Sequence, residues 1–139
     1  YSIPEGLIKA IIKVESRNNP YAIRYQPNYR WTYRVGQISD LHGVPEDTER
    51  NMQKTSWGLM QIMGAIARQL GFSKRYLSEL LKPHLNLKYG CKFLKQKYEQ
   101  HGNWQDAVSS FNQGSPRKDE NNMYYNQSYV DSVFKIYKE

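Results

Sequence analysis

Glu15 is the residue whose type and position most directly suggest chemistry. Successive residues of an α-helix are offset by about 100°, so the apolar residues before it share one arc of a predicted first helix. They are Leu7, Ile8, Ile11 and Ile12. Glu15 projects into the centre of this arc, where desolvation favours the protonated carboxyl group and suits it to act as a general acid. For a single glutamate the alternative is a solvated helix end, with pairing to Lys13 or Arg17.

Three short blocks of sequence follow one another in a distinctive order. Residues 15–22 read ESRNNPYA, residues 56–63 read SWGLMQIM, and residues 107–114 read AVSSFNQG. They resemble E-S-x-x-N-P-x-A, G-L-M-Q-I-M and A-x-x-x-Y-N-x-G of the soluble lytic transglycosylase (SLT) catalytic domain and of goose-type lysozymes. Tyr129-Val130, with Val133 and Tyr137, resembles the closing helix of that family. The resemblance covers nearly the whole chain and implies a mostly helical, lysozyme-like domain with a substrate cleft.

The resemblance implies a catalytic role for Glu15 alone. This carboxyl group would protonate the glycosidic oxygen between N-acetylmuramic acid and N-acetylglucosamine in peptidoglycan. As a carboxylate it would then take a proton from the C6 hydroxyl of the sugar, which gives a 1,6-anhydro product. Because no water is consumed, one acid suffices where ordinary glycosidases use two. The enzyme expected is therefore a lytic transglycosylase, a lyase of the bacterial wall.

The same resemblance implies a set of substrate-binding residues beside Glu15. They are Ser56, Gly58, Leu59, Met60, Gln61, Met63, Phe111, Asn112 and Tyr129. Gln61 is expected to hydrogen-bond an acetamido or hydroxyl group of the substrate, and Met63 to supply an apolar wall.

Two departures from the family pattern concern hydroxyl groups. The tyrosine of Y-N-x-G is Phe111 here, so Tyr129 or a tyrosine of the insertion described below is the candidate replacement. The serine that the family has six positions before G-L-M-Q falls on Met52, and Ser56 or Thr55 is the candidate for its role.

A hydrolytic mechanism is the main rival. Goose-type lysozymes that invert configuration place aspartates near the positions of Met52 and Met63, and an inverting enzyme needs a second carboxylate to activate water. The remaining candidates all lie between Glu15 and Gly58: Asp40, Glu46, Asp47 and Glu49. A non-catalytic wall-binding module is a third hypothesis, and the presence of Glu15 disfavours it.

Residues 25–54 lengthen the chain relative to the family pattern, because Glu15 and Gly58 are 43 positions apart. This insertion is rich in aromatic residues, and residues 45–49 predict the start of a short helix. Such a long loop is usually functional or disordered, and its aromatic residues favour order. They form either a flap whose rings stack on sugars or a local cluster on the flank of the domain.

Length and charge set the remaining expectations. The chain of 139 residues is expected to form a single monomeric domain over residues 1–139. Its net charge of +7 indicates affinity for an anionic wall, or simply solubility, because no nucleic-acid-binding motif accompanies it. The chain has no transmembrane segment, and it starts with Tyr1, which is consistent with removal of a leader or a neighbouring region. The substrate therefore sets the location: the cell envelope (periplasm or secreted), or a phage enzyme delivered to the wall.

No metal or organic cofactor is expected. His42, His84 and His101 show no ligand spacing with one another or with Cys91. Cys91 lies in an apolar stripe and is expected to be a small buried residue without a disulfide.

The pattern of caps and apolar residues predicts six helices besides the short one in the insertion. They cover residues 3–15, 64–70, 73–81, 86–100, 103–111 and 128–137. Ser2 and Glu5 form a capping-box pattern for the first helix, and Gly71 ends the second in a left-handed conformation.

Overall fold

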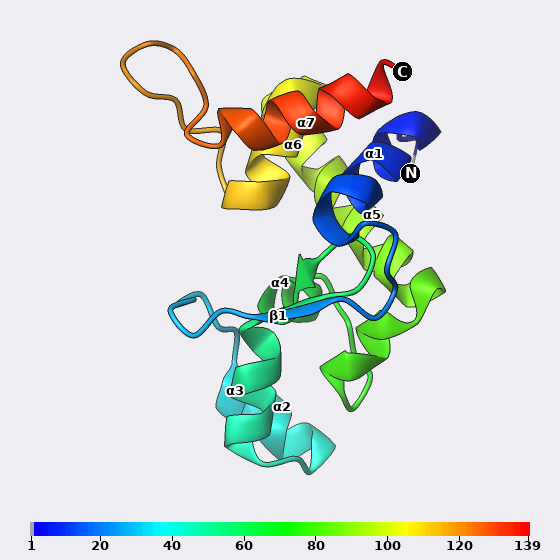
Figure 1. Ribbon diagram of the computed structural model, residues 1–139. Helices are drawn as coiled ribbons and strands as arrows, with labels where there is room; N and C mark the ends of the chain where they lie inside the picture. Colours follow the sequence, from blue (N-terminus) through cyan, green and yellow to red (C-terminus); the bar gives the residue numbers. More distant parts are fainter. Residues whose placement is uncertain (1) are drawn as a thin grey trace. The chain divides into compact units, whose positions relative to one another are not determined.

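The structure is a computed structural model that describes residues 2–139 (Figure 1). Its helices are α1 (Glu5–Ser16), α2 (Val35–His42), α3 (Glu46–Gln53), α4 (Gly64–Gln69), α5 (Pro83–His101), α6 (Trp104–Gln113) and α7 (Gln127–Tyr137), with a short 3₁₀ helix η1 (Leu77–Leu81). Its strands are β1 (Ile23–Tyr25), β2 (Thr55–Trp57) and β3 (Ile62–Met63). The mostly helical fold class is confirmed.

The chain divides into two compact units, which are described separately. Residues 15–90 form the sheet-containing unit, and residues 2–14 with 91–139 form the terminal unit. Two helices, α1 and α5, run from one unit into the other along the chain. The expectation of a single domain stays a prediction.

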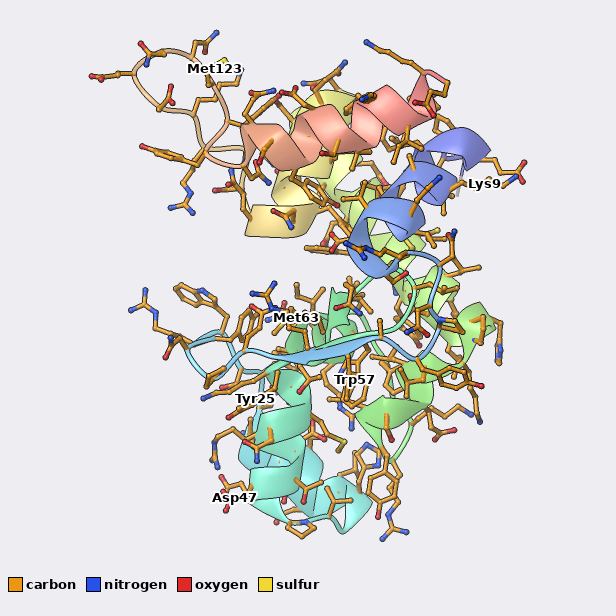
Figure 2. The ribbon with its side chains drawn as sticks, viewed as in Figure 1. Lys9, Tyr25, Asp47, Trp57, Met63 and Met123 are labelled. Atoms are coloured by element: carbon orange, nitrogen blue, oxygen red, sulfur yellow. The ribbon has the colours of Figure 1, made fainter. Side chains whose placement is uncertain are left out.

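The sheet of the first unit has the order β1-β2-β3 and is antiparallel throughout. Ser56 on the central strand lies opposite Arg24 on β1 and opposite Met63 on β3, and Trp57 lies opposite Ile23. Facing residues of antiparallel strands share one face of the sheet. One face therefore carries Arg24, Ser56 and Met63, while the other carries Ile23 and Trp57. Figure 2 shows Met63 and Trp57 on opposite sides of the strands.

Most of the insertion is regular structure rather than a loop. It begins at the last residue of β1 and contains two helices, α2 and α3, which lie against each other (Figure 1). The helix predicted from residues 45–49 is confirmed as α3. Gly43 follows α2 with φ of 65°, a left-handed conformation that glycine adopts without steric cost and that ends a helix.

A buried ion pair joins the insertion to α4. The Arg68 guanidinium donates from Nη2 to Glu49 Oε1 at 2.8 Å and from Nε to Glu49 Oε2 at 2.9 Å. Both side chains are almost fully withdrawn from solvent. Gln53 Nε2 also donates to the Glu49 carboxylate, at 2.8 Å, and Arg68 Nη1 donates to the carbonyl oxygens of Phe72 and Lys74. Each charge is thus both neutralised and hydrogen-bonded, as burial requires.

The terminal unit is built on α6 and α7, which contact each other (Figure 1). The buried residues of these helices include Ala107, Val108, Val130 and Val133. The α6 helix begins as predicted: the side chain of Asn103 accepts a hydrogen bond from the backbone N–H of Asp106, which satisfies one of the free donors at the helix start.

One predicted cap and two predicted helix starts are wrong. The first helix begins at Glu5, and Ser2, with φ of 57°, lies outside it, so the Ser2–Glu5 capping box does not form. The helix predicted for residues 73–81 is only the 3₁₀ helix η1. The α5 helix begins at Pro83 rather than Asn86, because proline suits the first turn of a helix. The other predicted helices agree with the structure to within two residues at each end.

Gly71 has φ of 100° after α4, as predicted.

Cys91 is buried and is not in a disulfide, as predicted. Burial raises the pKa of its thiol. Over residues 2–139, no helix has the length and apolar character needed to cross a membrane. The described residues also contain no group of three histidine, cysteine or acidic side chains placed to hold a metal ion.

The first prediction concerns the buried ion pair. Arg68→Met leaves the Glu49 carboxylate buried without a counter-charge, which costs about 3–5 kcal/mol of unfolding free energy. The matched control Arg50→Met breaks only exposed pairs with Glu46 and Asp47, which are worth about 1 kcal/mol or less. Urea unfolding followed by circular dichroism measures both. Equal losses in the two variants would show that the buried pair has no special structural role.

Candidate active site

Glu15 lies in the last turn of α1. Its predicted apolar arc is confirmed in part: Leu7 and Ile11 are fully buried, whereas Ile8 and Ile12 are only partly buried. Glu15 itself is half-buried, and Ser16 beside it is buried. The carboxylate is therefore partly withdrawn from water and partly accessible.

The chain turns sharply after α1. Arg17 and Asn18 adopt left-handed conformations, with φ of 54° and 63°. The Asn19 side chain then accepts a hydrogen bond from the backbone N–H of Tyr21 at 3.0 Å, and the Asn19 carbonyl accepts one from Ala22. This turn explains the asparagines of the block ESRNNPYA, since asparagine tolerates the left-handed region and stabilises turns with its side chain.

Hydrogen bonds join the first block to the second. The Ala22 carbonyl oxygen accepts from the backbone N–H of Gly58 at 2.7 Å and from Gln61 Nε2 at 3.0 Å. Gln61 Nε2 also donates to the Gly58 carbonyl at 2.9 Å. Residues 58–61 thus form the turn between β2 and β3, with Gln61 itself at φ of 52°. The segment that carries Glu15 is fixed to this turn.

Asn86 supports the same turn from inside the unit. Its Oδ1 accepts from the backbone N–H of Met60 at 2.8 Å, and its Nδ2 donates to the carbonyl oxygens of Trp57 and Leu80 at 2.7 and 2.9 Å. Gly58, with φ of 67°, lies so close that an added Cβ would stand 2.5 Å from Asn86 Nδ2. Sequence reasoning placed Asn86 only at a helix start. An asparagine within the apolar pattern of α5 was the signal for this role.

Ser56 and Met63 meet across β2 and β3. The Ser56 hydroxyl donates to Met63 Sδ at 3.0 Å and accepts from Gln26 Nε2 at 2.8 Å. Both residues are buried. Gln26, at the end of β1, therefore joins the residues implied to bind substrate, although sequence reasoning did not single it out.

Leu59 and Met60 follow Gly58 in the turn and differ in exposure. Leu59 is partly exposed, whereas Met60 is fully buried. A Cβ on Gly90 would collide with the Met60 side chain, so glycine makes room for it. Met60 thus packs beneath the turn, and its contact with substrate stays a prediction.

The remaining implied residues belong to the terminal unit. Phe111 is buried, with its ring centroid 5.6 Å from that of Phe93. Asn112 is exposed, and its Oδ1 accepts from Asn126 Nδ2 at 2.9 Å. The backbone carbonyl oxygen of Asn126 also accepts a hydrogen bond from the backbone N–H of Tyr129, which is half-buried. Asn126 therefore connects the third block to the closing helix, a role that its sequence context did not indicate.

One polar contact braces each end of α6. Lys97 Nζ donates to the Gly114 carbonyl at 3.1 Å, and burial lowers the pKa of this amine. At the start of α6, the Tyr124 hydroxyl donates to the Asp106 carboxylate. Burial and this hydrogen bond raise the pKa of Tyr124. Burial alone would raise the pKa of Asp106, but the hydrogen bonds from Tyr124 and Asn103 lower it overall. The contact between Tyr124 and Asp106 joins the segment after α6 to the helix that carries Phe111.

The four acidic residues of the insertion differ in their surroundings. Asp40, Glu46 and Asp47 are exposed on α2 and α3, and Figure 2 shows Asp47 on the α3 side of the unit, away from Met63. Glu49 is fully buried and forms a salt bridge with Arg68. A water-activating base must be able to reach water and substrate, which Glu49 in this state cannot do.

Comparison with known sequences places these blocks in a family. The family model of the Transglycosylase SLT domain matches residues 1–132, so the chain belongs to this family of transglycosylase-type enzymes. Similar curated proteins include Protein IpgF of Shigella sonnei and Protein IpgF of Shigella flexneri. Each is 27% identical over 138 residues, which cover 99% of this chain and 73% of the relative. No solved structure matches the chain significantly. The resemblance found in the sequence is confirmed.

The second prediction tests the support of the turn. Asn86→Ala removes the three hydrogen bonds of this side chain and leaves the buried Met60 N–H without this acceptor, and an unsatisfied buried group costs about 1–3 kcal/mol. We expect a large loss of unfolding free energy together with loss of activity. Asn51→Ala removes an exposed asparagine side chain from α3 and serves as the control. Stability unchanged by Asn86→Ala, as measured by urea unfolding, would show that the turn stands without it.

Proposed function

We propose that the protein is a peptidoglycan lytic transglycosylase that cleaves the β-1,4 bond between N-acetylmuramic acid and N-acetylglucosamine, with Glu15 as general acid and then base. The observation that carries the proposal is the hydrogen bonding of Ala22 to Gly58 and Gln61. It fixes the segment of Glu15 to the turn that the family uses to line its substrate site. Family membership supplies the class of reaction.

The reaction needs one group that first donates and then accepts a proton. Protonated Glu15 donates to the glycosidic oxygen as the bond from C1 of N-acetylmuramic acid breaks. The Glu15 carboxylate then accepts the proton of the C6 hydroxyl while O6 bonds to C1. The half-buried position of Glu15 suits both steps, because partial burial shields the reacting groups from bulk water and partial access admits the substrate.

The turn would bind the sugar from one side of Glu15. Gln61 Nε2 already donates to two backbone carbonyl groups, so its Oε1 is the atom left to accept a hydrogen bond from an acetamido N–H or a hydroxyl group. Ser56, Gly58, Leu59, Met60 and Met63 complete this part of the site as proposed binding residues. Phe111, Asn112 and Tyr129 stay proposed binding residues on the family resemblance alone, with Tyr129 or a tyrosine of the insertion as the proposed source of the hydroxyl that Phe111 lacks.

The proposed place of action is the bacterial cell envelope, reached either by export or by delivery from a phage. The net charge of +7 supports it, because the peptides and glycopolymers of the wall carry negative charge. The proposed enzyme acts as a monomer. The proposal involves no cofactor and no nucleic acid.

The third prediction is that Glu15→Gln folds normally but loses lysis of purified peptidoglycan. Removal of the proton donor should lower the rate at least about 10²- to 10⁴-fold, while an amide of the same shape preserves packing. Thermal unfolding checks the fold, and turbidity of a peptidoglycan suspension checks the rate. Activity like that of the wild type in a folded variant would refute the role of Glu15.

The fourth prediction separates the transglycosylase from an inverting hydrolase. Mass spectrometry of products from the wild type should show 1,6-anhydromuropeptides, which are one water lighter than hydrolytic products. Asp40→Asn, Glu46→Gln and Asp47→Asn should each leave the rate within a few fold of the wild type. Reducing-end products, together with a loss on the order of 10² in one of these variants, would make the protein an inverting lysozyme.

A further inference from the structure

The segment after α1 is unusual in its charge. Residues 16–39 contain four arginines, at 17, 24, 30 and 34, and no aspartate or glutamate. All four are exposed. The same stretch carries five of the aromatic residues of the chain, which are Tyr21, Tyr25, Tyr29, Trp31 and Tyr33. Residues 24–34 are called the arginine-aromatic loop below.

The arginine-aromatic loop is fixed at both ends. At its start, the Gln26 backbone N–H donates to the Lys54 carbonyl at 2.8 Å, and Lys54 Nζ donates to the Pro27 carbonyl at 3.3 Å. At its end, Tyr33 exchanges hydrogen bonds with the buried side chain of Gln53, at 2.6 and 2.9 Å. A loop fixed in this way loses little conformational entropy when it binds a ligand.

Aromatic rings of the arginine-aromatic loop face solvent. The side chain of Trp31 is 66% exposed and that of Tyr25 is 53% exposed. Elsewhere the tryptophans are covered: Trp57 is buried, and Trp104 stacks on Tyr98. The Arg30 guanidinium lies 5.4 Å from the centre of the Trp31 ring. A cation and an exposed indole side by side offer contacts to a ligand that has both negative charge and flat apolar faces.

The loop is continuous with the candidate active site. Gln26 donates to Ser56 Oγ and, at 3.5 Å, to Met63 Sδ. Arg24 lies opposite Ser56 in the sheet and therefore shares its face with Ser56 and Met63. A polymer bound beside Met63 can thus continue past Arg24 towards the loop within the same unit.

We infer that the arginine-aromatic loop is a second binding surface for the peptidoglycan strand, outside the reacting sugars. Trp31 would stack on the apolar face of a sugar ring, and Arg24, Arg30 and Arg34 would pair with carboxylates of the peptides that the strand carries. The absence of any acidic residue from residues 16–39 favours an anionic partner. The inference rests on the proposed function for the identity of the polymer.

The fifth prediction tests this surface by sedimentation with insoluble peptidoglycan. All variants are made in the Glu15→Gln background, so that the polymer is not degraded. Arg30→Gln with Trp31→Ala should raise the apparent Kd about tenfold, which corresponds to about 1.4 kcal/mol. Trp31→Phe should keep most of the binding, because an exposed ring is retained. Thermal unfolding should be the same in each variant and its parent.

The chain offers a matched control in the same unit. Arg75 lies 5.5 Å from the ring centre of Tyr76, which is 41% exposed. Arg75→Gln with Tyr76→Ala removes the same charge and an exposed ring, and it should leave binding unchanged. If both double substitutions weaken peptidoglycan binding equally, the loss reflects only the lower net charge, and the inference is wrong.

Two further outcomes separate this inference from the proposed function. If the wild type releases anhydro products while Arg30→Gln with Trp31→Ala leaves retention intact, the inference is wrong and the enzyme stands. If the wild type releases no product but retention depends on Trp31, the surface stands and the proposed catalysis is wrong.

A duplex DNA oligonucleotide is the second probe. If the double substitution abolishes DNA binding and leaves peptidoglycan retention intact, the loop is a nucleic-acid site instead.

Discussion

The ion pair between Glu49 and Arg68 is the contact on which the sheet-containing unit depends. Two charges withdrawn from water are tolerated only when each is neutralised and hydrogen-bonded. Here Gln53 donates a further hydrogen bond to Glu49, and backbone carbonyl groups accept further hydrogen bonds from Arg68. The pair joins α3 of the insertion to α4, which directly follows β3. Because Gln53 also bonds to Tyr33, the same network fixes the end of the arginine-aromatic loop. The insertion is therefore part of the framework of this unit rather than an appendage.

The turn of residues 58–61 shows how this framework serves the site. Its conformation is unfavourable for most residues, with positive φ at Gly58 and at Gln61. Contacts from two directions stabilise it: Ala22 from the segment after α1, and Asn86 from α5. Glycine occupies position 58 for two reasons: the backbone there is left-handed, and Asn86 lies too close for a Cβ atom. The motif G-L-M-Q therefore forms a strained turn, and contacts from Ala22 and Asn86 stabilise it.

Sequence reasoning succeeded where the signal was local. The cap at Asn103, the helix starting near residue 46 and the buried Cys91 all follow from neighbours in the chain. The motif order identified the family and, through it, the implied role of Glu15. Sequence reasoning missed β1, because this strand has only three residues and all three are exposed, so it shows no alternation of buried and exposed positions.

Polar side chains that pair with residues far away in the chain could not be predicted from the sequence either. Arg68 looks like an ordinary basic residue of a short helix until Glu49, 19 positions earlier, is placed beside it. Asn86 and Asn126 likewise gain their roles only from groups brought close by folding. Buried polar residues are uncommon in proteins, and their pairing depends on tertiary structure that no local pattern encodes.

Cys91 gives the protein a built-in reporter of its own motions. Only the thiolate reacts readily with alkylating reagents, and burial both covers this sulfur and raises its pKa. Labelling must therefore await transient opening of the structure around the middle of α5. Since Cys91 is the single thiol of the chain, its labelling rate relative to that of a free thiol reports the free energy of that local opening without an engineered probe.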